Sequence, residues 1–220
     1  KYEMPVLGYT PEHNAYPYNY MIGSEAQRRD AIDYLKLSLE MAKEMGAEFV
    51  LTSPANGGYL ATYDQLWSRL EKNIQELGDY AAKLEIKLVV EALTPYESNF
   101  FTRANDLVEL FRRVDNPYVV GMCDIVPPFV QHESIMAYFD KLGNKMDHMH
   151  IIDGENGSDT HLIPGEGNIP IKEMLYEMKR IGYDKTATLE LVTNYINEPR
   201  FYAKRAIDNM RELMAEAGIV

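Results

Sequence analysis

The distribution of apolar residues along the chain predicts an alternation of strands and helices. Short apolar runs rich in β-branched residues are typical of buried strands, and segments with apolar residues three or four positions apart are typical of helices that cover a sheet. The predicted strands span about residues 5–9, 49–53, 87–92, 119–123, 146–152 and 187–192. The predicted helices span about residues 25–45, 63–84, 103–113, 132–142, 171–181 and 198–217.

The first helix carries the clearest boundary signals. Ser24 can cap its N-terminus, and Gln27 three residues later completes the spacing of a capping box. Gly46 is expected to end the helix, because glycine adopts the left-handed conformation common after a last helical turn. The predicted core face consists of Ile32, Leu35, Leu39 and Ala42.

The regular βα alternation predicts a parallel sheet covered by helices, because right-handed crossovers join parallel neighbours. Both a doubly wound sheet and a TIM (β/α)8 barrel satisfy this pattern. A TIM barrel repeats its unit eight times in about 250 residues, whereas six units are predicted in these 220 residues. On the barrel interpretation, residues 1–220 form a single domain from which the first two βα units are absent, since a strand follows Lys1 almost at once.

Polar residues favour the barrel. Each of four successive predicted strands carries a metal-type ligand at or near its C-terminal end: Glu91, Asp124, His150 and Glu190. Consecutive members are about 26 to 40 residues apart, close to the roughly 31 residues of one barrel unit. Side chains at equivalent points of successive strands converge on the barrel mouth, and a charge in an apolar strand is costly unless it is paired or coordinated. Any one of these residues alone is more simply a satisfied core polar group, but four in register predict one divalent cation.

The predicted ligands are three carboxylates and one imidazole, which favours Mn²⁺, with Co²⁺, Mg²⁺ or Zn²⁺ as alternatives, and leaves positions for two substrate oxygens. His148 lies two residues before His150 and therefore faces the same side of the strand. Two interpretations of His148 stay open: it orients the metal ligands from behind, or it packs beside them. Cys123 faces away from Asp124 and is expected to be a small buried residue.

Charge and cysteine content narrow the class of protein. The chain has 34 acidic and 22 basic residues and a net charge of -12, which argues against nucleic acid as a partner, because phosphate binding depends on Lys and Arg. No apolar run approaches the length of a membrane span, and no signal-peptide pattern opens the chain. The single cysteine cannot form an intrachain disulfide. We therefore expect a cytoplasmic protein.

Several motifs resemble a known family, the xylose-isomerase-like sugar epimerase superfamily. They are the Glu/Asp/His/Glu set on successive strands, the E-x5-E spacing of Glu91 and Glu97, and the P-G-E-G turn at residues 164–167. Four longer segments look like the members that act on fructoselysine: GYTPEHNAYPYN at 8–19, LTPYESN at 93–99, SDTHLIPGEG at 158–167 and ELVTNYINEPR at 190–200. The resemblance covers essentially the whole chain and implies the TIM barrel.

The resemblance also implies an activity, that of a metal-dependent ketose 3-epimerase converting fructoselysine to psicoselysine. The metal would act as a Lewis acid that acidifies the C3–H bond of the sugar. Glu91 and Glu190 would lie on opposite faces of the sugar. One would remove the C3 proton to give a cis-enediolate, and the other would return a proton from the far side, which inverts C3.

Three further residues are implied as substrate contacts. Glu97 matches a residue that contacts the terminal oxygens near C1 and C2, although a loop salt bridge is the alternative, and Asn99 is a weaker candidate at the same rim. His161 stands where related epimerases carry an arginine, and either binds a sugar hydroxyl or is an exposed loop histidine. Pro127 departs from the pattern, because related ketohexose epimerases have a substrate-binding histidine there. This departure counts against free tagatose or psicose as substrate.

Other interpretations stay open or are disfavoured. A DNA-repair endonuclease of the superfamily would need more metal ligands and a basic surface, and this acidic chain has only five histidines. Another one-metal sugar enzyme of the same barrel, such as an inosose dehydratase or a hydroxypyruvate isomerase, would differ only in its pocket. A sugar-binding barrel without turnover is disfavoured by the Glu91 and Glu190 pair.

The resemblance also implies a homo-oligomer.

Overall fold

The structure, a computed structural model, describes residues 3–14, 17–155 and 157–219. Residues 15 and 16, which belong to the first segment of the family resemblance, lie outside the described residues. The chain divides after Met122 into an N-terminal unit, residues 1–122, and a C-terminal unit, residues 123–220. Each unit is described by itself.

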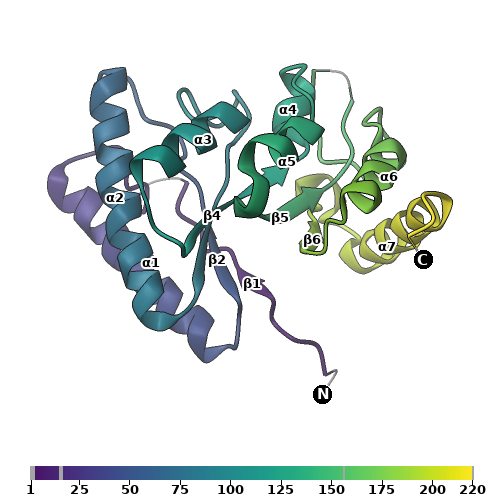
Figure 1. The fold of residues 1–220 in the computed structure, drawn as a ribbon, viewed down its shortest axis with the longest axis horizontal. Coiled ribbons are helices and arrows are strands. Elements are labelled where there is room, and N and C mark those ends of the chain that lie inside the picture. The colour runs from purple at the N-terminus through teal and green to yellow at the C-terminus, as the bar shows by residue number, and fades with distance from the viewer. Residues whose placement is uncertain (1–2, 15–16, 156, 220) are drawn as a thin grey trace. The chain divides into compact units, whose positions relative to one another are not determined.

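The N-terminal unit is built on parallel strands in the order β1-β2-β3-β4 (Figure 1). Its strands are β1 (Gly8–Tyr9), β2 (Phe49–Thr52), β3 (Lys87–Val90) and the first residues of β4 (Val119–Asp124). In register, Phe49 pairs with Lys87, and Leu88 pairs with Val119. Its helices are α1 (Glu25–Glu44), α2 (Tyr63–Leu84) and α3 (Ala104–Arg113).

Both faces of β2 and β4, and of β3 after Lys87, are buried, as expected for parallel strands with covering helices. One face forms an apolar cluster, which consists of Phe49, Leu51, Val89, Val120 and Met122. Side chains alternate along a strand, so Glu91, two residues after Val89, continues the face of β3 that carries this cluster. Within the N-terminal unit, the apolar cluster thus lies on the strand face that ends at Glu91.

The helix signals in the sequence are confirmed in the N-terminal unit. Ser24 and Gln27 form the predicted capping box, and Gly46 has a φ of 76°. Thr62 caps α2 with a second capping box, and α2 has the predicted bounds. The predicted core face of α1, made by Ile32, Leu35, Leu39 and Ala42, is buried. The first strand is shorter than predicted, with only Gly8 and Tyr9 in the ladder.

The C-terminal unit contains one parallel strand pair, β5 (Met146–Ile151) and β6 (Thr186–Leu189) (Figure 1). In this pair, His150 pairs with Thr188. The other elements are α4 (Val126–Val130), α5 (Met136–Leu142), the 3-10 turn η1 (Gly143–Lys145), α6 (Ile171–Ile181), the 3-10 turn η2 (Thr193–Tyr195) and α7 (Pro199–Glu216). Helix α6 has the predicted bounds, and the last strand lies earlier than predicted.

The predicted helix over residues 132–142 begins later than predicted, since α5 spans Met136–Leu142, and a short helix that was not predicted, α4, precedes it. Pro127 and Pro128 lie in the first turn of α4, where proline is tolerated because backbone N–H groups there have no intrahelical acceptor. His132 then adopts a φ of 55° and separates the two helices.

Among the described residues, no helix combines the length and the apolar character needed to cross a membrane.

Glu85, which follows α2, provides a test of backbone strain. Its φ of 54° and ψ of 43° place a residue with a Cβ in the left-handed conformation. This conformation costs non-glycine residues about 1 kcal/mol, and a negative charge at a helix C-terminus adds an unfavourable interaction. We expect Glu85→Gly to increase the free energy of unfolding by about 0.5–1 kcal/mol in urea denaturation. Lys72→Gly, at an exposed position inside the same helix, should decrease it by about 1 kcal/mol.

Candidate metal centre

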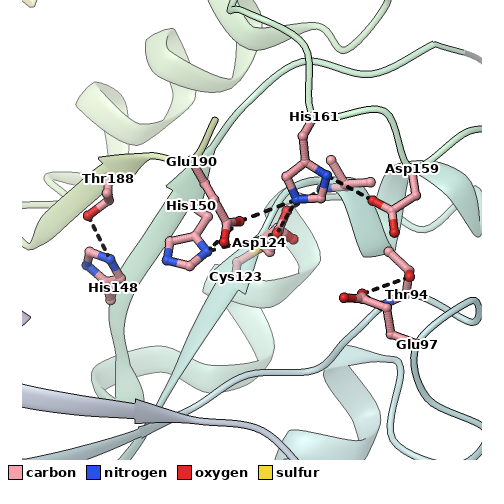
Figure 2. Close-up of polar contacts among 11 residues, drawn as sticks. Thr94, Glu97, Cys123, Asp124, His148, His150, Asp159, His161, Thr188 and Glu190 are labelled. Atoms are coloured by element: carbon pink, nitrogen blue, oxygen red, sulfur yellow. Dashed lines mark hydrogen bonds and ion pairs between the residues drawn. The ribbon is translucent and has the colours of Figure 1, made fainter. Parts of the chain in front are cut away.

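A carboxylate, an imidazole and a second carboxylate meet at the C-terminal ends of the strands in the C-terminal unit (Figure 2). Asp124 is the last residue of β4, His150 lies near the end of β5, and Glu190 directly follows β6. The Nδ1 atom of His150 lies 3.0 Å from Glu190 Oε2 and 4.0 Å from Asp124 Oδ2. The structure therefore brings together three of the four predicted ligands.

These three side chains differ in exposure. The side chains of Asp124 and His150 are 7% and 8% exposed, whereas that of Glu190 is 36% exposed. Burial raises the pKa of the Glu190 carboxyl, but hydrogen bonds from His150 and His161 outweigh burial and lower it well below its usual value. Glu190 is thus an ionised carboxylate that is open to a ligand.

The two carboxylate oxygens of Asp124 have different partners. Oδ1 accepts a hydrogen bond of 2.8 Å from the backbone N–H of Val126, at the start of α4. Oδ2 faces the imidazole of His150 and, at 3.7 Å, the Nε2 atom of His161. Helix α4 therefore holds the Asp124 carboxylate in one orientation, with Oδ2 toward the site.

His161 also joins this cluster, from the loop between β5 and α6. Its Nε2 atom lies 3.3 Å from Glu190 Oε2, and its Nδ1 atom lies 3.0 Å from Asp159 Oδ1. Burial lowers the pKa of the imidazole, but hydrogen bonds to three carboxylates outweigh burial and raise it to about 12. The sequence pattern alone left an exposed loop histidine open for His161, and its side chain is only 12% exposed.

The donor set in the C-terminal unit fits a divalent cation. His150 Nδ1 lies 3.0 Å from Glu190 Oε2 and 4.0 Å from Asp124 Oδ2, so the three side chains are close enough to share one ion. Asp124, His161 and Glu190 also offer one ligand atom each within 4.8 Å of one another. Asp124, His150 and Glu190 would hold the ion through two oxygens and one nitrogen.

His148 contacts residues of β6 beside this cluster. Its Nδ1 atom lies 2.7 Å from Thr186 Oγ1. Its Nε2 atom lies 3.1 Å from Thr188 Oγ1 (Figure 2), and its ring meets that of His150 edge to face. Burial and the neighbouring His150 lower the pKa of His148 to about 4. A neutral imidazole thus packs against the ring of a proposed metal ligand. This contact is compatible with both interpretations of His148.

Three predicted site residues belong to the N-terminal unit. Glu91 directly follows β3, is 7% exposed and donates its backbone N–H to Thr52 O. Glu97 Oε2 accepts hydrogen bonds from the backbone N–H and the Oγ1 hydroxyl of Thr94 (Figure 2). Asn99 accepts from Gly57 N and donates to Gly58 O, both at 2.9 Å, and so ties its loop to the loop after β2. Their roles toward substrate stay predictions.

Sequence reasoning missed Asp153, the residue that organises the loop after β5. Its buried carboxylate accepts hydrogen bonds of 2.9 Å from the backbone N–H groups of Gly154, Gly165 and Ile169. A Cβ at Gly167 would overlap Asp153 Oδ1, which explains the second glycine of the P-G-E-G turn. In the sequence, only one feature indicates a special role for Asp153: it is an acidic residue directly after the apolar run that follows His150.

Asp159 was also missed, although it lies two residues before His161 in the segment that carries the family resemblance. It pairs with His161 and is 19% exposed. Nothing in the apolar pattern distinguishes it from other loop acids, because its contact depends on the path of the loop.

Pro127 lies in α4 and is buried.

Comparison with protein families identifies the class of this fold. Residues 2–213 match the model of the xylose isomerase-like TIM barrel family. The chain belongs to this family, and the predicted TIM-barrel fold class is confirmed.

Individual relatives are more specific. The chain is 48% identical to fructoselysine 3-epimerase of Shigella flexneri over 98% of this chain and 78% of that protein. Among solved structures, a D-tagatose 3-epimerase-like protein matches 99% of this chain and 79% of its own chain, with a TM-score of 0.81 and 22% identity. The IOLI protein, crystallised with a bound zinc atom, matches 97% of this chain and 76% of its own, with a TM-score of 0.77 and 19% identity.

The carboxylate of Asp153 provides a test of the loop's construction. We expect Asp153→Ala to decrease the free energy of unfolding by about 2–4 kcal/mol, because each buried backbone donor without an acceptor costs about 1–3 kcal/mol. Urea denaturation measures the change, and hydrogen exchange should locate faster exchange at Gly165 and Ile169. Asp140→Ala, at an exposed position of α5, should change stability by no more than about 0.5 kcal/mol. Equal stability of the two variants would contradict this role of Asp153.

Proposed function

We propose that this chain is a divalent-metal-dependent ketose 3-epimerase, with fructoselysine as the preferred substrate and psicoselysine as the product. The observation that carries the proposal is the convergence of Asp124, His150 and Glu190 at the ends of three strands, with ligand spacing that suits one ion. The 48% identity to fructoselysine 3-epimerase supports the choice of substrate. The family match supports a barrel in which such strand ends form the active site.

The proposed metal site contains Glu91 in addition to the three ligands of the C-terminal unit. We propose that both units contribute to one barrel domain and that Glu91, at the end of β3, completes the site as fourth ligand. Carboxylate oxygens with one imidazole nitrogen favour Mn²⁺, with Co²⁺, Mg²⁺ or Zn²⁺ as alternatives. A bound divalent ion would supply a Lewis acid that makes the C3–H bond of a ketose more acidic.

Glu91 and Glu190 are the proposed acid and base. Inversion of a carbon through a planar enediolate needs a proton to leave from one face and another to arrive from the opposite face, since a single base on one face would restore the original configuration. One glutamate therefore removes the C3 proton, and the other donates a proton to the opposite face. The greater exposure of Glu190, compared with the buried Asp124 and His150, supports a role in which it meets the substrate.

The remaining predicted residues would define the substrate. Glu97 and Asn99 are proposed to contact the oxygens near C1 and C2, and His161 is proposed to bind a hydroxyl group of the sugar. The hydrogen bonds of Glu97 to Thr94 and of Asn99 to the glycine loop would hold these side chains at the rim. A homo-oligomer in the cytoplasm stays a prediction.

The other one-metal enzymes of the superfamily would use a similar metal site. An inosose dehydratase or a hydroxypyruvate isomerase would differ in the pocket, and a barrel without turnover would bind a sugar unchanged. Position 127 favours the fructoselysine reaction over epimerisation of free ketohexoses, because a proline there has no side-chain donor for a sugar hydroxyl.

Solvent deuterium uptake at C3 tests the proposed reaction directly. In D2O, Mn²⁺-loaded protein should introduce deuterium at C3 of fructoselysine and form psicoselysine, both detectable by NMR and mass spectrometry. Glu190→Gln should decrease exchange about 10²- to 10⁴-fold, the range for loss of an acid–base group, while sugar binding measured by calorimetry is largely retained.

Glu212→Gln, which removes an exposed carboxylate from α7, is the matched control and should exchange C3 like the unmodified chain. No C3 exchange on fructoselysine or on a panel of free ketohexoses would exclude the epimerase. Unchanged turnover in Glu190→Gln would exclude the role assigned to that residue alone.

Metal affinity provides a separate test that does not depend on turnover. We expect Asp124→Asn to weaken Mn²⁺ binding, measured by calorimetry, by at least about 10- to 100-fold, since even residues behind the ligands have effects of this size. Chelation of the metal should abolish C3 exchange, and added Mn²⁺ should restore it. Equal Mn²⁺ affinities of Asp124→Asn and the unmodified chain would contradict the ligand assignment.

A further inference from the structure

The imidazole of His161 lies between carboxylates on both of its edges (Figure 2). Its Nδ1 atom lies 3.0 Å from Asp159 Oδ1. Its Nε2 atom, on the other side of the ring, lies 3.3 Å from Glu190 Oε2 and 3.7 Å from Asp124 Oδ2. One edge of the ring thus faces a loop acid, and the other faces the proposed acid–base residue.

The two nitrogens of a histidine have different roles when one of them has a fixed partner. A carboxylate accepts hydrogen bonds only, so a carboxylate beside Nδ1 keeps the proton on that nitrogen and fixes the plane of the ring. In this chain, that partner is Asp159. The orientation of Nε2 toward Glu190 then follows from the position of Asp159.

The loop that carries this pair is held on both sides of His161. Asp153 and Leu162 exchange two backbone hydrogen bonds of 2.7 Å, which close the loop after β5. On the other side, Asn194 Nδ2 donates a hydrogen bond of 2.6 Å to Thr160 O. His161 itself has a φ of 46°, a left-handed conformation that costs a residue with a Cβ about 1–3 kcal/mol.

A purely stabilising ion pair would not account for this arrangement. The left-handed backbone of His161 costs about 1–3 kcal/mol and persists only where the surrounding structure holds it. Both side chains are mostly buried, at 12% and 19% exposed, and the imidazole reaches the proposed metal site and not the solvent. Strained residues that a surrounding structure holds in place are concentrated at functional sites.

We propose that Asp159 is a positioning residue, which holds the His161 imidazole with Nε2 directed at Glu190 and at the sugar hydroxyl that binds beside it. This inference rests on the proposed epimerase function and adds a residue to it. Asp159 acts through His161 and does not itself touch the substrate. Its contribution is the orientation of the ring and the proton on Nδ1.

The test compares Asp159→Ala, which removes the acceptor, with Asp159→Asn, whose amide oxygen can still accept from Nδ1–H. We expect Asp159→Ala to decrease kcat for C3 epimerisation about 10- to 100-fold, as for other residues that orient an active-site histidine, with a smaller change in KM. Asp159→Asn should recover part of this loss. Glu155→Gln, an exposed acid in the same loop, is the control and should match the unmodified chain.

Nitrogen NMR of histidine-labelled, Mg²⁺-loaded protein provides a readout that does not depend on turnover. The unmodified chain should show His161 with a hydrogen-bonded proton on Nδ1, and Asp159→Ala should lose this signal. Mn²⁺ affinity should stay within about threefold in both variants, because Asp159 is not a proposed ligand.

Two outcomes would overturn the inference. The first is a His161 ring that carries its proton on Nε2 alone in the unmodified chain, a measurement that needs no variant to fold. The second is wild-type kcat in a folded Asp159→Ala protein. If the unmodified chain shows the Nδ1 signal but no C3 exchange, the proposed function fails and the placement of His161 by Asp159 stands.

Discussion

The central constraint on this structure is the repulsion between carboxylates at neighbouring strand ends. Asp124 and Glu190 face the same imidazole nitrogen, and two ionised carboxylates in a partly buried site repel one another unless positive charge lies between them. In the described residues, histidine supplies this charge, since His161 contacts both carboxylates. A divalent cation would meet the same need with twice the charge, so the carboxylate pair that His161 neutralises would also favour a bound cation.

The parallel sheet brings these carboxylates together and also confines them to one edge of the sheet. Parallel strands end on one side of the sheet, so any polar residue placed last on a strand meets those of its neighbours. Charge is therefore concentrated at the last residues of the strands, where it can act on a ligand.

Much of this arrangement was predictable from the sequence, because it depends on periodicity. Regular apolar spacing predicts helices over residues 63–84 and 171–181, and both have the predicted bounds. Strand alternation and strand-end position also predicted that Asp124, His150 and Glu190 would meet. Helix α4 was not predictable in the same way, since its short apolar sequence with two prolines has no period.

The contacts of Asp153 and Asp159 were hidden for a different reason. Each depends on the path of a loop, which is determined by hydrogen bonds between residues far apart in the chain, such as that of Asn194 to Thr160. An acid that binds three backbone amides and an acid that is solvated look the same in a list of residues. Only the folded loop distinguishes them, and the same is true of the left-handed backbone at His161.

The way in which Asp153 builds its loop has a consequence for how such enzymes diversify. The Asp153 carboxylate binds backbone N–H groups, and Gly167 can lie against this carboxylate because glycine has no Cβ. The base of the loop therefore depends on Asp153 and Gly167, one at each end. The side chains between them are presented by this frame but do not build it. Mutation can therefore exchange the side chains that the loop presents while the frame persists, and a new ligand preference can arise without a new fold.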